Sequence, residues 1–332
     1  MPPKVLILTH GDTDGVCAAA IAKASYPEAE IEFATPSDFV LKLDSLSGYD
    51  RIIILDLGIN YAQKAEAMAA FQKLSKTSSI IYIDHHLKPP GVTEKSLACS
   101  GMMHKANAST SELAWRFFKP SPSHDFIAVL GAIGDYQEYT PRMRKLVEKY
   151  GGRNVYPEAI FLDWALAVSE DSFKREVVEE LVKGRWPLNI FTLEERAAKA
   201  VKRRREVEKH VQEKAEKICK HVMLVRDVPF EATGLAAHLL TKRDNIDVGI
   251  GASTVTPPRW SFFFQEKPYV RLSMRRHIRS DINLASLIEK CASKFGGAGG
   301  GHEEAAGGKI PIDRFDEFLK ELKRALAREK KC

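Results

Sequence analysis

The sequence lacks long apolar runs. No stretch approaches the roughly 18 consecutive apolar residues of a membrane-spanning helix, so we expect no membrane partner. Cysteine is also scarce: the five cysteines include no CxxC pair and are odd in number, which argues against a disulfide framework and favours free thiols in a reducing compartment. Residues 1–4 lead at once into an apolar run typical of a strand, so we expect no signal peptide. Together these absences predict a cytoplasmic protein.

What the chain does have is a set of apolar segments that end in Asp or His. Three of them are typical of buried parallel strands, and a fourth is rich in small residues. The carboxyl ends of parallel strands meet at one edge of a sheet, where α/β proteins bind ligands. The polar residues that follow the four segments are His10, Asp12, Asp14, Asp56, Asp84, His85, His86 and Asp135. Solvated turn acids are the alternative, but several crowded carboxylates would cost stability unless cations neutralised them.

The chemistry of these side chains indicates which metal they would bind. Six candidate ligands offer carboxylate oxygens and two imidazoles but no thiolate, which suits Mn²⁺ or Mg²⁺ better than structural zinc. These candidates are His10, Asp12, Asp14, Asp56, His85 and Asp135. They are too many for one ion and suit two ions that share a carboxylate. Two ions about 3.5–4 Å apart can activate water and hold the attacking and leaving oxygens of a phosphoester hydrolysis.

In order and spacing, the segments HGDTDG, Asp56, DHH and GAIGD resemble the four motifs of the DHH phosphoesterase superfamily. That superfamily includes RecJ-type exonucleases, bacterial nanoRNases, cyclic-dinucleotide phosphodiesterases and family II inorganic pyrophosphatases. The resemblance covers nearly the whole chain, because a second motif of the family lies near the other end. It therefore implies a two-metal phosphoesterase domain followed by a DHH-associated domain.

The resemblance also implies a role for each motif residue. The residues that would bind one ion are His10 and Asp12, and those that would bind the other are Asp14, His85 and Asp135. Asp56 would bridge the two ions. Asp84 would orient an imidazole from behind the metals, and His86 would face the phosphate, so these two are the expected catalytic residues. Mn²⁺ is the expected ion, with Mg²⁺ as the alternative.

A glycine-rich segment lies near the carboxyl end. Residues 295–302 read FGGAGGGH, and so many glycines would weaken a helix or strand interior, which predicts a loop. A flexible linker is the alternative, although ordered-looking sequence follows it. The segment resembles the GGGH motif of the DHH-associated domain, which binds the nucleotide end of the substrate in relatives, although Ala298 interrupts the glycines. The expected substrate contacts here are Gly299, Gly300, Gly301 and His302.

The strand expected at 269–276 carries positively charged side chains. Its alternation places Arg271, Ser273 and Arg275 on one face, a spacing that can present guanidinium groups to phosphate. A similar Ser-x-Arg strand faces the substrate in the family, so the resemblance makes Arg275 the best candidate for substrate binding, whereas Arg271 could lie on a solvated face. The upstream segment WSFFF, residues 260–264, is expected to complete a hairpin, with its rings in the core or stacked on bases.

The remaining pattern predicts a doubly wound, mainly parallel α/β sheet followed by a smaller α/β domain. Helix-like stretches at 14–24, 61–74 and 110–118 alternate with the strands, and Ser109 and Glu112 form a capping box before the last of them. Residues 192–222 contain no Gly or Pro and carry a narrow apolar stripe, which predicts one long helix. Ten basic against six acidic residues give this helix a solvated face or a weak attraction for nucleic acid.

A chain of 332 residues exceeds the usual limit of one core. We expect a DHH domain at 1–187, a helical connector at 188–222 and a substrate-binding domain at 223–332. The expected function is that of a RecJ-like exonuclease, which would hydrolyse single-stranded DNA or RNA to mononucleotides by two-metal activation of water. One alternative is a small-substrate enzyme acting on a dinucleotide, a cyclic dinucleotide or adenosine 3′,5′-bisphosphate, and another is a non-catalytic scaffold. Expected partners are single-stranded nucleic acid or short oligonucleotides, and a homo-oligomer and replication or repair proteins stay open.

Overall fold

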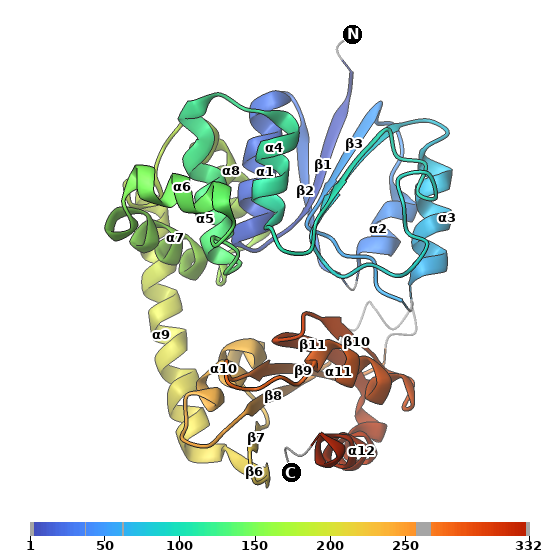
Figure 1. Cartoon of the computed structure of the whole chain (residues 1–332), viewed down its shortest axis with the longest axis vertical. Coiled ribbons are helices and arrows are strands. Elements are labelled where there is room, and N and C mark those ends of the chain that lie inside the picture. Colours follow the sequence, from blue (N-terminus) through green and yellow to red (C-terminus); the bar gives the residue numbers. More distant parts are fainter. Residues whose placement is uncertain (1–2, 37, 62, 257–266, 330–332) are drawn as a thin grey trace. The chain divides into compact units, whose positions relative to one another are not determined.

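Apolar runs rich in isoleucine form a five-stranded parallel sheet in the first part of the chain (Figure 1). The structure is a computed structural model that describes residues 3–36, 38–61, 63–256 and 267–329, and the chain divides into the units Met1–Ala200 and Val201–Cys332. In spatial order the strands of the first unit are β2 (Glu30–Ala34), β1 (Val5–His10), β3 (Arg51–Leu55), β4 (Ser79–Asp84) and β5 (Gly101–His104). All four neighbouring pairs are parallel, as expected.

Helices cover both faces of this sheet (Figure 1). One apolar core joins Ile7, Ile53 and Ile81 to the helices α1 (Thr13–Ser25), α4 (Thr110–Phe118), α5 (Asp125–Gly134), α6 (Pro141–Tyr150), α7 (Gly152–Leu166) and α8 (Asp171–Val182). The other joins Ile52, Ile54 and Tyr82 to α2 (Phe39–Ser45) and α3 (Lys64–Leu74). Strands buried on both faces read as continuous apolar runs, which is why the sequence identified them. The doubly wound α/β prediction is confirmed.

Local side chains set where the helices begin. Asp12 caps α1, because its Oδ1 accepts the N–H of Gly15 at 3.0 Å, and Ser109 Oγ caps α4 by accepting the N–H of Glu112 at 3.1 Å. Glu112 does not complete the expected capping box among the described contacts, since its Oε2 accepts the hydroxyl of Thr140 at 2.7 Å. The small-residue segment that precedes Asp135 lies in α5. The candidate ligands therefore follow helix ends as well as strand ends, at the same edge of the unit.

The second unit contains a six-stranded mixed sheet. In spatial order its strands are β10 (Ala298–Gly301), β11 (Ala305–Pro311), β9 (Tyr269–Arg276), β8 (Val248–Val255), β7 (Val222–Val225) and β6 (Glu216–Cys219). Among the strands that the structure describes in this sheet, only the β7 and β8 pair is parallel. The helices of this unit are α10 (Thr233–Thr241), α11 (Leu284–Ser293) and α12 (Phe315–Arg328), and the unit boundary falls within α9 (Phe191–Lys214). The domain boundaries expected from the sequence, between residues 187 and 188 and between residues 222 and 223, stay predictions.

The helix in the structure is shorter than the one expected over residues 192–222. Helix α9 ends at Lys214, and the next residues form β6, which pairs in antiparallel fashion with β7. Ile218 and Val222, which fall within the expected helix, are strand residues, and Val222 is fully buried. Pairing with neighbouring strands overrides a local preference for helix, and no Gly or Pro marks the change.

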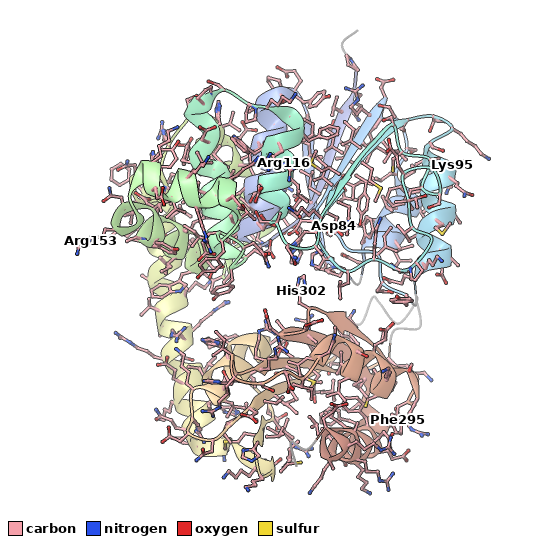
Figure 2. The ribbon with its side chains drawn as sticks, in the orientation of Figure 1. Asp84, Lys95, Arg116, Arg153, Phe295 and His302 are labelled. Atoms are coloured by element: carbon pink, nitrogen blue, oxygen red, sulfur yellow. The ribbon has the colours of Figure 1, made fainter. Side chains whose placement is uncertain are left out.

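The glycine-rich segment is also not the loop that was expected. Ala298–Gly301 is the edge strand β10, paired with β11. Phe295, labelled in Figure 2, precedes this strand, and its ring centroid lies 6.3 Å from that of Phe318 in α12. A Cβ at position 299 would lie 2.7 Å from Ile288 Cγ1, so the glycine lets α11 pack closely. Gly301 has φ 131°, which other residues rarely adopt. Packing and turn geometry therefore account for these two glycines. Hydrogen bonds to β11 offset the conformational entropy that glycine loses in a strand.

The remaining expectations concern cysteines, aromatic residues and membranes. Cys17, Cys99 and Cys291 are free thiols, whereas Cys219 is disulfide-bonded, so the expectation of free thiols is wrong at that position. Spacing could not show this, because a disulfide depends on proximity created by folding. The aromatic segment 260–264 lies outside the described residues. Among the residues that are described, no helix combines the length and apolar character needed to cross a membrane.

Candidate metal centre

The candidate ligands gather at the carboxyl edge of the parallel sheet. His10 is the last residue of β1, Asp84 is the last residue of β4, and Asp56 directly follows β3. Figure 2 shows Asp84 at this edge of the first unit. The backbone of Asp56 is left-handed, with φ 58°, a conformation that Asp tolerates better than most residues. Strained backbone at a buried acid is a frequent feature of functional sites.

Three groups of possible ligand atoms include Asp56: one joins it to Asp84 and His86, and the other two consist of expected metal ligands. His10, Asp12 and Asp56 form one group and Asp14, Asp56 and His85 the other, with all ligand atoms of a group within 4.8 Å of one another. The two oxygens of Asp56 face different groups: Oδ2 lies 3.7 Å from His10 Nδ1, and Oδ1 lies 3.4 Å from His85 Nε2. His10 Nδ1 also lies 2.8 Å from Asp12 Oδ2. This is the arrangement that a carboxylate bridging two cations requires.

Asp135 extends the second group from the end of α5. Its Oδ2 is buried and lies 3.5 Å from His85 Nδ1, but it accepts no hydrogen bond from any residue that the structure describes. A buried carboxylate oxygen without a donor is costly unless a cation neutralises it. Asp135 therefore lies beside the second group, and its role as a metal ligand stays a prediction.

The amino end of α4 holds two of the candidate ligands. Both oxygens of Asp14 accept backbone N–H groups, from Thr110 at 2.6 Å and from Ser111 at 2.9 Å. The Thr110 hydroxyl donates to Asp56 Oδ1 at 2.9 Å. All of these residues are buried. The sequence marked this helix start as a cap, and its Ser/Thr-rich composition was a signal of the added role.

Asp84 fixes the orientation of His86. Asp84 is fully buried, its Oδ1 lies 2.8 Å from His86 Nδ1, and its Oδ2 accepts the hydroxyl of Tyr82 at 3.1 Å. His86 Nε2 is on the opposite edge of the ring. Burial opposes protonation of His86, but the charge of Asp84 and the hydrogen bond to it raise the pKa of the imidazole. Gly58 makes room for this ring, because a Cβ there would lie 2.7 Å from His86 Cβ.

The titration of the cluster reflects its crowded charges. Burial and the charge of Asp56 raise the pKa of Asp14 to about 7, and burial and the charge of Asp14 raise the pKa of Asp135 to about 8. Burial also acts against the charge of Asp56, yet hydrogen bonds from His10 and His85 hold its pKa well below the usual range. Although burial lowers it, the pKa of His85 is raised to about 11 by its hydrogen bond to Asp56 and by the charge of that acid. Without a cation, Asp135 and part of the Asp14 population retain a proton at neutral pH, whereas Asp56 is ionised.

These residues fit a pair of hard divalent cations. Carboxylate oxygens and imidazole nitrogens without thiolates suit Mn²⁺ or Mg²⁺. A cation would replace the retained protons and neutralise the acids, which burial otherwise penalises. The donor set and the buried oxygen of Asp135 together indicate that the cluster could hold metal ions.

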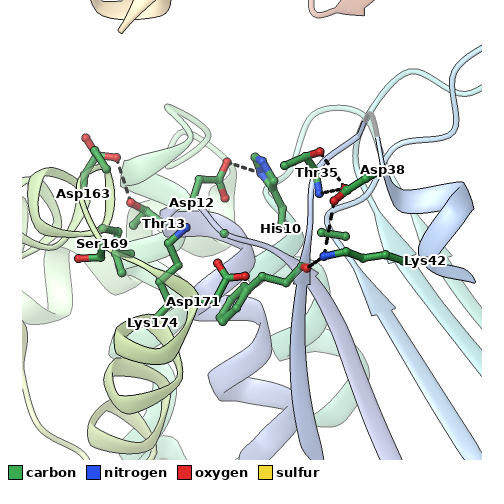
Figure 3. Close-up of a pocket in the computed structure, with 15 residues that line it drawn as sticks. His10, Asp12, Thr13, Thr35, Asp38, Lys42, Asp163, Ser169, Asp171 and Lys174 are labelled. Carbon is green, nitrogen blue, oxygen red and sulfur yellow. Dashed lines mark hydrogen bonds and ion pairs between the residues drawn. The ribbon is translucent and has the colours of Figure 1, made fainter. Parts of the chain in front are cut away.

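A cavity of about 320 Å³ adjoins the first group and contains a lysine that sequence reasoning missed (Figure 3). Lys174 of α8 extends its amine over the loop after β1, where a Cβ on Gly11 would lie 2.5 Å from Lys174 Nζ. Its Nζ makes no hydrogen bond or ion pair with the described residues, and burial lowers its pKa. Two acids of the cavity have partners: Asp38 accepts from Thr35 Oγ1, and Asp163 accepts from Thr13 Oγ1. No local pattern marked Lys174, because only the fold brings α8 to this loop.

The expected substrate residues of the second unit lie on and beside its sheet. Arg275 is on β9 and pairs with Ala305, and the N–H of His302 donates to the carbonyl of the same Ala305 at 2.8 Å. Burial alternates along β9, so Arg271, Ser273 and Arg275 share the less buried face. The glycines of β10 lie on the far side of β11 from Arg275. The substrate roles of these residues stay predictions.

Comparison with known proteins gives two family matches. The model described as "DHH family, N-terminal domain" matches residues 4–140, and the model described as "DHHA1 domain" matches residues 248–328. A curated relative, an uncharacterized protein of Methanocaldococcus jannaschii, is 38% identical over 52 residues, which cover 16% of this chain and 16% of the relative.

Three solved structures share the fold at 16% identity over 98% of this chain. A DHH domain described as belonging to a member of a family of ribosomal proteins has a TM-score of 0.71 and is covered over 86% of its length. RecJ from Thermus thermophilus in complex with Mn²⁺ has a TM-score of 0.65 and is covered over 52%. A pGpG-specific phosphodiesterase from Vibrio cholerae has a TM-score of 0.55 and is covered over 99%. From its two family matches and the motif residues that converge at the sheet edge, the chain belongs to the DHH family of phosphoesterases and carries a DHHA1 domain in its second unit.

Proposed function

We propose that the protein is a metal-dependent exonuclease that hydrolyses single-stranded DNA or RNA to mononucleotides. The observation that carries the proposal is the position of Asp56, whose two oxygens face two separate groups of ligand atoms. Two divalent ions would lower the pKa of a water molecule and polarise the scissile phosphate. Mn²⁺ is the proposed ion, and the RecJ structures in complex with Mn²⁺ and with Mg²⁺ support both choices.

The proposed ligand roles follow the two groups. His10 and Asp12 would hold one ion, and Asp14, His85 and Asp135 the other, with Asp56 between them. Hydrogen bonds from the amino end of α4 fix the carboxylate of Asp14 before any ion binds. Such fixed ligands cost little reorganisation when charge develops in the reaction.

The imidazole of His86 would donate a hydrogen bond to the phosphate. Asp84 holds Nδ1 of the ring and raises the pKa of the imidazole, which favours the protonated form whose Nε2–H can donate to an oxygen that gains negative charge. The Lys174 amine beside Gly11 would add a second cation that contacts a phosphate oxygen. In the second unit, Arg275, His302 and the glycines of β10 would bind the terminal nucleotide, which favours release of mononucleotides from an end.

A small-substrate activity is the second candidate. The pGpG-specific phosphodiesterase aligns over 99% of its own length, whereas the chain spans about half of RecJ from Thermus thermophilus and 90% of another manganese-bound RecJ. An enzyme that acts on a linear dinucleotide needs the same ligands and the same grip on a terminal nucleotide, but no track for a longer strand. Substrate length therefore separates the two candidates.

Digestion of end-labelled oligonucleotides tests the proposal. DNA and RNA strands of several lengths, labelled at the 5′ or the 3′ end, are incubated with Mn²⁺ or with EDTA. We expect Mn²⁺-dependent release of mononucleotides and its loss in Asp56→Asn, which keeps the shape of the side chain but removes the bridging charge. Asp244→Asn, at an exposed aspartate of the second unit, is the matched control. Cleavage confined to dinucleotides would establish the second candidate, and full activity of Asp56→Asn would refute the two-metal centre.

A further inference from the structure

The loop between β7 and α10 holds an aromatic ring in an unusual backbone conformation. Three of its residues have a left-handed backbone: Asp227 with φ 52°, Phe230 with φ 58° and Glu231 with φ 54°. For a bulky residue such as Phe this conformation is a genuine outlier, and glycine or asparagine would adopt it at lower cost. The side chain of Phe230 is nevertheless 48% exposed, so packing in a core does not explain it. An exposed ring on strained backbone indicates a functional constraint.

The surroundings of this ring suit a flat, uncharged ligand. Phe230 lines a cavity of about 610 Å³ together with Arg203, Asp227, Val228, Glu231, Ser253, Thr254 and Arg271. Arg203 Cζ lies 4.9 Å from the centre of the Phe230 ring, and Arg271 Nη1 pairs with Glu231 Oε2 at 2.8 Å. Two arginines and two acids leave the lining without net charge. Hydroxyl groups beside an aromatic face can hydrogen-bond and stack a nucleobase, while a phosphate would find no excess positive charge here.

The cavity continues the row of residues predicted to bind the terminal nucleotide. Arg271 lies on the same face of β9 as Ser273 and Arg275, and the Ser273 and Thr233 hydroxyls are 2.8 Å apart. Four residues of strand separate Arg271 from Arg275 by ~13 Å, several times the ~3.4 Å rise per nucleotide of a stacked strand. A base at Phe230 would therefore belong to a different nucleotide from the one at Arg275.

Arg203 also belongs to the most basic run of α9, residues 202–205, which reads KRRR. Lys and Arg side chains attract a nucleic-acid backbone without reading its sequence. The neutral cavity and the basic run thus offer the two parts of a single-strand site, a stacking platform and a positive path for phosphates.

We propose that Phe230 is a stacking platform for a base of single-stranded nucleic acid, beyond the terminal nucleotide that Arg275 would hold. Arg203 covers one face of the ring, and the base stacks on the other. This inference rests on the proposed phosphodiesterase function and specifies its substrate as a strand longer than a dinucleotide.

Binding of a labelled single-stranded oligothymidylate of about ten nucleotides, measured by fluorescence anisotropy in EDTA, tests the platform. Phe230→Ala should raise the Kd about 5- to 150-fold, since stacking contributes ~1–3 kcal/mol per base. Phe230→Tyr keeps the ring and should bind like the wild type, whereas Phe230→Leu should bind like Phe230→Ala. Ile278→Ala removes an apolar side chain that is 94% exposed in the same unit and is the control for loss of surface area.

Thermal unfolding gives an independent readout of the backbone. Because Gly accepts φ 58° and Ala does not, Phe230→Gly should melt about 2–4 °C above Phe230→Ala while both bind the strand equally poorly. Wild-type affinity in Phe230→Ala or Phe230→Leu would overturn the platform. A wild-type protein that hydrolyses dinucleotides but does not bind the strand would also overturn it and leave the phosphodiesterase intact. Ring-dependent binding without any hydrolysis would keep the platform and refute the proposed function.

Discussion

Replacing Asp14 with asparagine tests whether the buried cluster is built for cations. In the metal-free protein both oxygens of Asp14 accept backbone N–H groups, from Thr110 and Ser111. An asparagine has one oxygen, so one of these buried N–H groups loses its acceptor. The loss should cost about 1–3 kcal/mol of the free energy of unfolding at any pH.

The charge of Asp14 adds a term that depends on pH. Burial and the charge of Asp56 raise its pKa from 3.8 to about 7 in the folded protein. The stability associated with the protonated acid is therefore fully present below pH 3.8 and is lost as pH rises toward 7. The slope is ~1.4 kcal/mol per pH unit, which amounts to about 4 kcal/mol over this window. Asparagine does not titrate, so the stability of Asp14→Asn does not fall with pH in this way.

The two stability curves should consequently cross. At pH 4 the wild type should be more stable, and by pH 7 the metal-free Asp14→Asn protein should be, with the crossing at about pH 4.5–6. Melting temperatures measured in EDTA from pH 4 to 8 give the comparison, because titrating groups common to both proteins largely cancel in the difference. With Mn²⁺ at 100 times its Kd the wild type should gain ~2.7 kcal/mol per bound ion, and the variant should gain less, having lost a ligand.

The matched control, Asp244→Asn at an exposed position, should follow the wild type at every pH and at every Mn²⁺ concentration. A difference between wild type and Asp14→Asn that does not change with pH would refute the buried-charge argument. Equal stabilisation of both proteins by Mn²⁺ would show that Asp14 is not a ligand.

Three further predictions concern the neighbours of the cluster. Asp84→Asn should lower kcat by about 10- to 100-fold because it lowers the pKa of His86, while calorimetry should still detect two bound Mn²⁺ ions; loss of an ion would contradict the orienting role. Gly11→Ala should displace the Lys174 amine and lower kcat/KM about 10-fold, as Lys174→Met should, and full activity of either would exclude a phosphate contact. Ser109→Ala removes the cap of α4 and should cost about 1 kcal/mol, seen as a melting temperature lower by ~2–4 °C; an unchanged value would mean that the cap is dispensable.

The sequence was most informative where local pattern and chemistry coincide. Apolar runs placed His10, Asp56 and His85 at strand ends, and parallel strands must bring those ends to one edge. The same local reasoning failed where long-range pairing decided the conformation. Residues after Lys214 joined a sheet although their composition favours a helix, and the glycines of β10 form an edge strand because β11 supplies hydrogen bonds.

The sequence by itself determined the α/β class, the candidate ligands and the preference for a hard divalent cation, because these depend on periodicity and on the chemistry of single side chains. Only the tertiary structure decided how the ligands are held and what surrounds them. Thr110 reaches Asp14 across 96 residues, Lys174 lies over Gly11, and the left-handed backbone of Asp56 aims its two oxygens at separate groups. Such contacts join segments far apart in the chain, so no local pattern encodes them, and they exist only once the fold has brought those segments together.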